Sequence, residues 1–267
     1  MIFQDKTVII TGGSAGVGAA TARLFADAGA NLVLVARDKK NLEALADELR
    51  DRTRVVIFPM DVTDADACVD VFKKAAFEFG DVHILVNNAG YHARGDVANV
   101  AADDLARIVD VNLRAPIVLS RIAIPYLKES GAAAIINVGS LAGRTHVPGS
   151  AGYSASKSGL RAFTYALAEE LRDSGIKIGI LENDQRGLAR QLEQHWLQVA
   201  RGFDCHITPD AGGTGKVDPA NTGMRNQMHH RVMRVLGRAQ HAGQRTFGKA
   251  GFIQNIHQML VGFRAVF

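Results

Sequence analysis

The stretch that decides the fold is TVIITGGSAGVG, residues 7–18. It opens with a short β-branched apolar run, which predicts a buried strand. Gly12, Gly16 and Gly18 permit a tight turn, and the run AATARLF that follows predicts a helix. A helix N-terminus presents amide donors and the positive end of a dipole. This turn between a strand and a helix therefore predicts a dinucleotide pyrophosphate site, with a purely structural turn as the alternative.

The next apolar run, NLVLVA at residues 31–36, predicts a second strand that ends just before Arg37 and Asp38. The residue at the end of this strand reaches the adenosine ribose in a dinucleotide-binding fold. A carboxylate there accepts hydrogen bonds from a free 2′-hydroxyl, whereas an arginine accommodates a 2′-phosphate. Because Arg37 comes first, the sequence predicts NADP rather than NAD, although a small shift of register would place Asp38 at the ribose.

A candidate acid–base pair lies further along the chain. Tyr153 and Lys157 are four residues apart in YSASK, so on a helix they share one face. An ammonium beside the ring favours the phenolate and lowers a phenol pKa that is normally about 10. Ser140 follows the apolar run AIINV at residues 134–138, so its hydroxyl is expected at a strand end beside the tyrosine. The alternative is that Tyr153 and Lys157 are surface residues at the start of an amphipathic helix.

Asparagines mark two further apolar segments. The run LVNNAG, residues 85–90, predicts a fourth strand, and Asn87 is expected to support the neighbouring strand ends and the cofactor. Asn112 lies within residues 105–127, an otherwise apolar-periodic helical stretch. A buried asparagine needs partners for its amide, so structural capping is the alternative to a functional role for Asn112.

Together, these motifs resemble the short-chain dehydrogenase/reductase (SDR) family over residues 5–181. The resemblance implies a catalytic tetrad, whose members here are Asn112, Ser140, Tyr153 and Lys157. It implies that Tyr153 is the general acid/base and that Ser140 orients the substrate oxygen. Lys157 is expected to bind the nicotinamide ribose and to lower the tyrosine pKa. Asn112 is expected to hold a water that links Lys157 to solvent in a proton relay.

The resemblance also implies a cofactor site and a reaction. Asp61 is expected to meet the adenine amino group, with Val62 beside the ring. The residues expected to contact the cofactor are Gly12, Ser14, Gly16, Val17, Gly18, Arg37, Asp61, Val62, Asn88, Ala89, Gly90, Tyr153 and Lys157. The implied reaction is reversible hydride transfer between NADP and a carbonyl or secondary alcohol, in a homodimer or homotetramer. A dinucleotide-binding protein that senses or regulates without turnover is the alternative.

Apolar runs alternate with helical patterns as far as residue 181, which predicts one α/β domain with a Rossmann-like, doubly wound parallel sheet and helices on both faces. The predicted strands lie near residues 7–11, 31–36, 54–60, 83–87, 133–138 and 177–181. The predicted helices lie near residues 17–29, 39–50, 64–79, 101–129 and 152–173. The expected organisation is a catalytic core over residues 1–181 and an atypical region over residues 182–267.

Composition limits the class of protein. The chain has 267 residues, 47% of them hydrophobic, enough to bury a sizeable core. Cys68 and Cys205 show no metal-ligand spacing, and a buried Cys68 thiol fits a reducing cytoplasm. The first strand begins too early to leave room for a signal peptide, and no apolar run is long enough to span a bilayer. A cytoplasmic protein with a small-molecule substrate and no metal is therefore predicted.

The last third of the chain differs from the rest. Residues 1–180 carry 20 Lys and Arg against 21 Asp and Glu, whereas residues 181–267 carry 11 against 6. The family resemblance predicts a Pro-Gly pair and then a threonine where this chain reads ENDQR, residues 182–186. Three explanations stay open: a divergent substrate region, a basic segment that binds an anionic partner, or a slipped reading frame near residue 182. A nucleic-acid partner is not expected, because the basic cluster within residues 225–238 lacks aromatic side chains for base stacking.

The histidines form no metal-binding signature such as HxxxH with a carboxylate partner. His92 follows the NNAG turn and is interpreted as a solvated loop residue rather than a pocket residue. His146 lies between Ser140 and Tyr153, and the resemblance makes it the stronger candidate for the substrate pocket.

Overall fold

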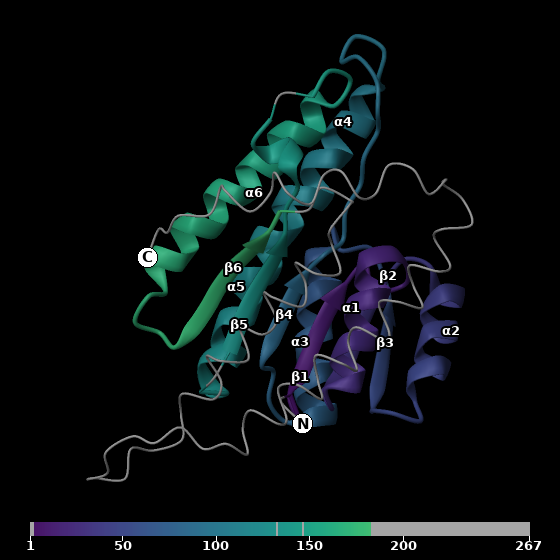
Figure 1. Ribbon diagram of the computed structural model, residues 1–267, viewed down its shortest axis with the longest axis vertical. Helices are drawn as coiled ribbons and strands as arrows, with labels where there is room; N and C mark the ends of the chain where they lie inside the picture. The colour runs from purple at the N-terminus through teal and green to yellow at the C-terminus, as the bar shows by residue number, and fades with distance from the viewer. Residues whose placement is uncertain (1–2, 132, 146, 183–267) are drawn as a thin grey trace, which may run out of the picture. The chain divides into compact units, whose positions relative to one another are not determined.

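The computed structural model describes residues 3–131, 133–145 and 147–182. Six parallel strands form one sheet in the order β3-β2-β1-β4-β5-β6 (Figure 1). They are β1 (Thr7–Thr11), β2 (Asn31–Ala36), β3 (Val55–Pro59), β4 (Ile84–Asn87), β5 (Ala133–Val138) and β6 (Ile176–Leu181). The chain reverses its direction across the sheet between β1 and β4, which confirms the predicted Rossmann-like, doubly wound fold.

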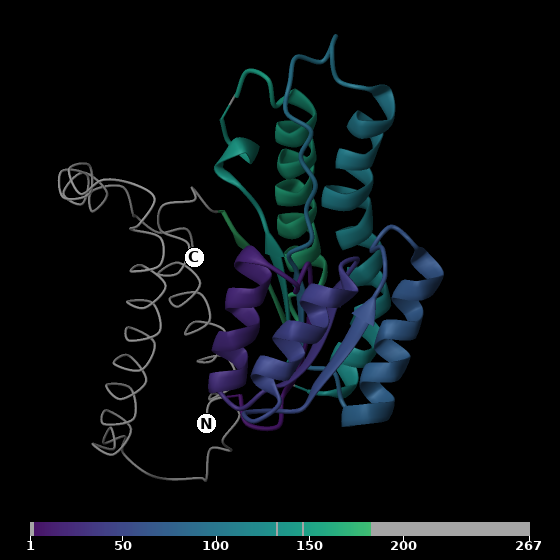
Figure 2. The same ribbon diagram turned by 90° about the vertical axis from the view of Figure 1, so that its right-hand side faces the viewer.

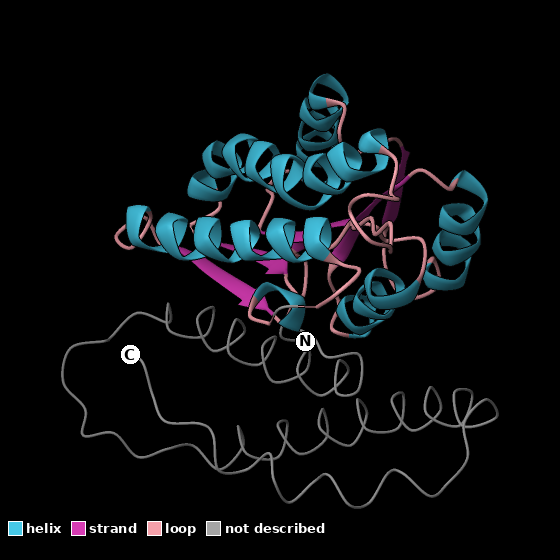
Figure 3. Cartoon of the chain, turned by 90° about the horizontal axis from the view of Figure 1, so that it is seen from above, coloured by secondary structure: helices cyan, strands magenta, loops and turns pink. Residues whose placement is uncertain are grey.

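Helices connect the strands and cover them (Figure 3). They are α1 (Gly16–Asp27), α2 (Lys39–Leu49), α3 (Ala65–Phe79), α4 (Ala102–Val109), α5 (Ala115–Glu129) and α6 (Ala151–Glu170). A π-helical turn, η1 (Asp110–Arg114), joins α4 to α5, and a 3₁₀ turn, η2 (Leu141–Gly143), follows β5. Among the described residues, no helix combines the length and the apolar content that crossing a membrane requires.

The core lies on both faces of the sheet. Val8 and Ile10 of β1 pack in one apolar cluster with residues of α1 and α2. Ile9, between them, packs in a second cluster with residues of α3 and α5. Successive side chains of a strand point to opposite faces, so a strand buried on both faces is apolar at every position. This explains why the continuous apolar runs of the sequence predicted the strands so closely.

The predicted helix over residues 101–129 is interrupted. The N–H of Ala115 donates to the carbonyl of Asp110, five residues earlier. In an α-helix it would donate to the carbonyl four residues earlier. Pro116 accounts for the shift, because proline has no N–H to donate to the carbonyl of Asn112. The resulting η1 turn contains the fully buried Asn112 and lies beside α6 (Figure 2). Such π-helical turns occur frequently at functional sites.

His83 directly precedes β4 and so lies at the amino ends of the parallel strands. It is buried, and its Nδ1 accepts a hydrogen bond of 3.1 Å from the N–H of Thr7. Burial, with a smaller contribution from the Lys6 charge, lowers the pKa of His83 from 6.5 to about 4. The folded protein therefore holds this imidazole neutral.

Candidate active site

The glycine-rich turn after β1 joins the start of α1 without a capping side chain. Ala15 occupies the N-cap position, and the first turn of α1 contains no acidic residue. Gly12 and Gly16 have φ values of +64° and +53°, which favour glycine. A Cβ on Gly18 would lie 2.2 Å from the carbonyl oxygen of Gly12, so the turn can close only with glycine there. The first amides of α1 are therefore left for an anion.

The turn after β4 supports the glycine-rich turn. Thr11 Oγ1 accepts hydrogen bonds of 3.0 Å from the N–H groups of both Asn88 and Ala89. The Asn88 amide donates in return to the carbonyls of Thr11 and Gly12, at 2.9 and 3.1 Å. Asn88 was predicted to bind the cofactor, and in the structure its side chain holds the turn that follows β1.

A cavity of about 440 Å³ lies at the carboxyl ends of the strands. It is lined by Gly12, Ser14, Ala36, Arg37, Asp38, Met60, Asp61, Val62, Ala89, Gly90, Tyr91 and Val111. Seven residues of the predicted cofactor set are among them. The other six do not line this cavity: Gly16, Val17 and Gly18 begin α1, Asn88 lies in the turn after β4, and Tyr153 and Lys157 lie on α6.

The end of β2 separates the roles of two charged residues. β2 ends at the small residue Ala36, and the exposed Arg37 follows it. Asp38 is the N-cap of α2, and its carboxylate accepts hydrogen bonds from the N–H of Asn41 at 3.0 Å and from the Asn41 amide at 2.6 Å. The carboxylate that complicated the cofactor prediction is therefore engaged by the helix it caps.

Asp61 follows β3 and is held by three donors. Its Oδ1 accepts from the N–H and the hydroxyl of Thr63, at 3.0 and 2.9 Å. Its Oδ2 accepts from the Arg107 guanidinium at 2.8 Å. Burial alone would raise the pKa of this carboxyl, but the bonds from Thr63 and Arg107 together lower it. Asp61 is thus a fixed carboxylate in the wall of the cavity.

Tyr153 and Lys157 lie one turn apart on α6, as predicted. The Lys157 Nζ is 5.8 Å from the centroid of the Tyr153 ring and donates a 2.7 Å hydrogen bond to the carbonyl of Val138, the last residue of β5. The Lys157 side chain is only 4% exposed. This burial lowers the pKa of Lys157 from 10.5 to about 8. The described ion pairs include no carboxylate partner for this lysine.

Ser140 follows β5 and caps the η2 turn. Its Oγ accepts a 3.2 Å hydrogen bond from the N–H of Ala142. Because that bond uses an oxygen lone pair, the hydroxyl proton stays available to a ligand.

Asn112 links three elements. Its Oδ1 accepts from the N–H of Tyr91 at 2.7 Å, and its Nδ2 donates to the carbonyl of Tyr91 at 2.8 Å and to Ser156 Oγ at 3.1 Å. The Ser156 hydroxyl donates to the carbonyl of Tyr153 at 2.7 Å. Ser156 was missed in the sequence, although it lies between Tyr153 and Lys157 in YSASK. Asn112 therefore has the hydrogen-bond partners that a buried asparagine needs. One of them, Ser156, connects it to the backbone of Tyr153.

His92 lies on the tyrosine as well. Its ring stacks on the Tyr153 ring, with centroids 4.3 Å apart and an interplanar angle of 24°. The side chain is exposed, as expected of a loop residue, yet it covers one face of the phenol. The protein covers part of the ring, and this partial desolvation, assisted by the Arg94 charge, lowers the pKa of His92. The loop that carries His92 is fixed further along by a 2.9 Å hydrogen bond from the N–H of Gly95 to the carbonyl of Gly149.

A series of buried side-chain hydrogen bonds joins β4 and β5 to α5 and α6. Asn87 of β4 donates to Asn137 of β5 at 2.9 Å and to Ser120 of α5 at 3.3 Å. Asn137 donates to Thr164 of α6 at 2.8 Å. The predicted supporting role of Asn87 thus takes the form of side-chain bonds that join two strands to α5 and α6.

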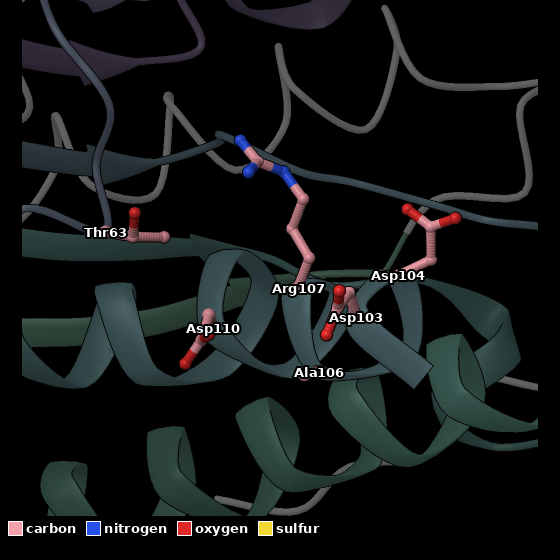
Figure 4. Close-up of a pocket in the computed structure, with 6 residues that line it drawn as sticks. All are labelled: Thr63, Asp103, Asp104, Ala106, Arg107 and Asp110. Atoms are coloured by element: carbon pink, nitrogen blue, oxygen red, sulfur yellow. The ribbon is translucent and has the colours of Figure 1, made fainter. Parts of the chain in front are cut away.

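A second cavity, of about 420 Å³, lies along α4 and is lined by Thr63, Asp103, Asp104, Ala106, Arg107 and Asp110 (Figure 4). It contains none of the predicted tetrad. In the described part of the chain, no cluster of His, Cys, Asp and Glu could hold a metal ion. Cys68 is buried, and burial raises the pKa of its thiol to about 11, so it is a structural thiol.

At Glu182 the predicted Pro-Gly pair is replaced by an ion-pair centre. The Glu182 side chain is 8% exposed and pairs with Arg144 and with Arg161, the latter at 3.1 Å. His146, Cys205 and the basic cluster lie outside the described residues, as do all predictions for residues 183–267.

The chain is similar to known proteins over most of the described residues. A family described as short chain dehydrogenase matches residues 6–182. Sulfoacetaldehyde reductase 2 of Chromohalobacter salexigens is 39% identical over 177 residues, covering 66% of this chain and 70% of the relative. An uncharacterised oxidoreductase of Staphylococcus aureus is 31% identical over 178 residues, covering 66% and 76%.

Solved structures are similar as well. The complex of a metagenomic short-chain oxidoreductase with NADP has a TM-score of 0.70 at 29% identity, covering 75% of this chain and 92% of the other. NAD⁺-bound xylitol dehydrogenase has a TM-score of 0.65 at 26% identity, covering 71% and 75%.

Proposed function

Because this chain belongs to the short-chain dehydrogenase family, we propose that it is an NADP-dependent oxidoreductase acting on a small carbonyl compound or secondary alcohol. The observation that carries the proposal is the pair formed by Tyr153 and Lys157. The pair lies at the carboxyl edge of the sheet, through the bond of Lys157 to the end of β5, and the cavity of about 440 Å³ lies at the same edge. A proton-transfer group and a dinucleotide site therefore share one edge.

The residues present fit a nicotinamide dinucleotide. The uncapped first turn of α1 offers amides to a pyrophosphate, and the cavity that begins at Gly12 and Ser14 continues to Asp61 and Val62. When bound, such a cofactor supplies or accepts the hydride. The protein's own residues supply its orientation and the proton.

Two observations support NADP over NAD. Ala36 ends β2 where a carboxylate would bond a 2′-hydroxyl, and Asp38 is engaged with Asn41. Arg37 lines the cavity, and arginine at this position accommodates a 2′-phosphate. The similar structures include one complex with NADP and one with NAD⁺.

In the proposed reaction, Tyr153 donates its phenolic proton to the carbonyl oxygen during reduction and recovers a proton during oxidation. The protonated form of Lys157, 5.8 Å from the ring, stabilises the phenolate that remains. The Ser140 hydroxyl, whose proton is not used by the bond from Ala142, donates a hydrogen bond to the same substrate oxygen. Pro116 has no N–H to donate to the backbone carbonyl of Asn112. We propose that the water of the proton relay binds at this carbonyl.

The similarity to a protein named sulfoacetaldehyde reductase places short anionic aldehydes first in a substrate screen. We also propose a homodimer or homotetramer formed through the helices at 101–129 and 152–173, because Ile117 and Tyr165 expose apolar surface there. A cytoplasmic location and a catalytic core at residues 1–181 complete the proposal.

The first test is binding of NADPH and NADH, followed by cofactor fluorescence and thermal shift. Turnover is then measured with a carbonyl screen on wild type, Tyr153→Phe and Tyr165→Phe. Tyr165 is a matched control, since it is an exposed tyrosine on the same helix. We expect Tyr153→Phe to abolish turnover and to leave NADPH affinity nearly unchanged, with Tyr165→Phe active. Turnover that survived in Tyr153→Phe would refute the mechanism, and NADPH binding without any turnover in wild type would indicate the sensing alternative.

A further inference from the structure

Arg107 lies outside the lining of the proposed cofactor cavity but holds two residues that line it. Its Nη2 lies 2.8 Å from Asp61 Oδ2, and its guanidinium lies 5.5 Å from the centroid of the Tyr91 ring. Asp61 and Tyr91 both line the cavity of about 440 Å³, whereas Arg107 lines the neighbouring cavity of about 420 Å³. Figure 4 shows the Arg107 side chain extended away from α4. It therefore reaches from one cavity to the wall of the other.

The bonds to Asp61 leave little of its carboxylate free. An ionised carboxylate has about four lone-pair sites. Thr63 occupies Oδ1 with its N–H and its hydroxyl, and Arg107 occupies one site on Oδ2. About one acceptor site, on Oδ2, is left for a ligand. Arg107 thus keeps the carboxyl ionised and determines which lone pair a ligand meets.

Tyr91 is held from the same face of α4. Its hydroxyl donates a 2.5 Å hydrogen bond to Asp104 Oδ1, and Asp104 lies three residues before Arg107 on the helix. Residues three apart on a helix are neighbours on its surface. One face of α4 therefore fixes both an acceptor and an aromatic ring in the cavity wall.

We propose that Arg107, with Asp104, is a positioning residue for purine recognition that makes the site select adenine over hypoxanthine. The inference rests on the proposed function, because it assigns the ligand at Asp61 as the purine of a dinucleotide. The amino group of adenine donates to the remaining lone pair on Oδ2. Hypoxanthine carries a carbonyl oxygen in place of that amino group, and this oxygen repels the fixed carboxylate.

The test measures the affinities of NADPH and of its reduced hypoxanthine analogue by nicotinamide fluorescence, without any substrate. The proteins are wild type, Arg107→Gln, Arg107→Lys, Thr63→Val and Arg121→Gln. Arg121 is the matched control, an exposed arginine on α5. We expect wild type to bind NADPH about tenfold or more tightly than the hypoxanthine analogue. A tenfold difference in affinity is about what one hydrogen bond to a charged group contributes.

Arg107→Gln should bring the preference close to one, Arg107→Lys should retain part of it, and Arg121→Gln should leave it unchanged. Thr63→Val keeps Arg107 and removes one bond to Oδ1, so it should lower the preference less than Arg107→Gln. General damage to the fold would lower the affinity for both dinucleotides together and leave the ratio of the two affinities unchanged. A change in this ratio therefore reports on the position of the Asp61 carboxylate.

A wild-type preference that persisted unchanged in Arg107→Gln would overturn the inference and leave the proposed function intact. Equal wild-type affinity for the two dinucleotides would do the same. Wild type that bound neither would instead overturn the proposed function, and the inference with it.

Discussion

Replacement of Lys157 by Met should make the protein more stable at neutral pH while removing its activity. The structure buries an ammonium that, within the described part of the chain, donates a hydrogen bond to the carbonyl of Val138 and to no other group. Lowering the Lys157 pKa from 10.5 to about 8 corresponds to a cost to the folded state of about 3 kcal/mol below pH 8. Methionine removes this cost but leaves the Val138 carbonyl without a donor, which costs about 1–2 kcal/mol. The net gain expected at pH 7 is about 1–2 kcal/mol.

The pH dependence gives the sharper test. Between about pH 8 and 10.5 the unfolded chain binds more protons at this lysine than the folded protein does. The free energy of unfolding of wild type should therefore rise, relative to Lys157→Met, as pH increases through this range, and the advantage of the variant should disappear. Lys40→Met, at an exposed position on α2, serves as the control.

The assay is urea denaturation followed by circular dichroism at several pH values, together with turnover at neutral pH. The difference in unfolding free energy between wild type and Lys157→Met is the measured quantity, because it cancels the titration of other groups. A difference that stayed constant from pH 7 to pH 10 would refute the assignment of a buried, strained ammonium.

Substitutions of His92, His83 and Arg37 test three other features of the structure. Replacing His92 by Ala should lower kcat by about 2- to 10-fold with little change in KM, because an aromatic stack is worth about 0.5–1.5 kcal/mol. His92→Phe should restore most of kcat, and equal losses in both variants, measured by steady-state kinetics, would argue against stacking. Burial lowers the pKa of His83 from 6.5 to about 4, so the free energy of unfolding should fall by about 3 kcal/mol as pH decreases between those values and the imidazole protonates in the unfolded chain. Acid denaturation of His83→Gln should lack this loss. Arg37→Ala should weaken NADPH binding about tenfold or more and leave NADH nearly unchanged, whereas Asp38→Asn should keep the NADPH to NADH ratio, by fluorescence titration.

The sequence predicted the sheet well because strands buried on both faces leave continuous apolar runs, such as residues 31–36, bounded by polar turns. Tyr153 and Lys157 were paired correctly because their spacing is a local property of a helix. The π-helical turn was missed, although Pro116 carried the signal through its missing N–H.

Contacts between distant segments could not be predicted. Arg107 and Asp61 are 46 residues apart, and no periodicity connects a helix face to the end of another strand. The same holds for His92, which the sequence favoured as a solvated residue and the structure stacks on Tyr153. Asp38 was ambiguous in sequence, because a carboxylate at a helix N-cap and one at a ribose look alike until its partner Asn41 is known.

The two bonds between the Asn112 amide and the backbone of Tyr91 affect what substrate binding must order. An amide that bonds both the N–H and the carbonyl of one residue acts as a short substitute for a neighbouring strand. Gly95 is anchored in turn to Gly149, so residues 92–94 form a short span between two fixed points. The conformational freedom of that span, and of His92 within it, is lost during folding rather than during substrate binding. The site is thereby preorganised, and the binding energy of a substrate is left to orient its reacting carbonyl.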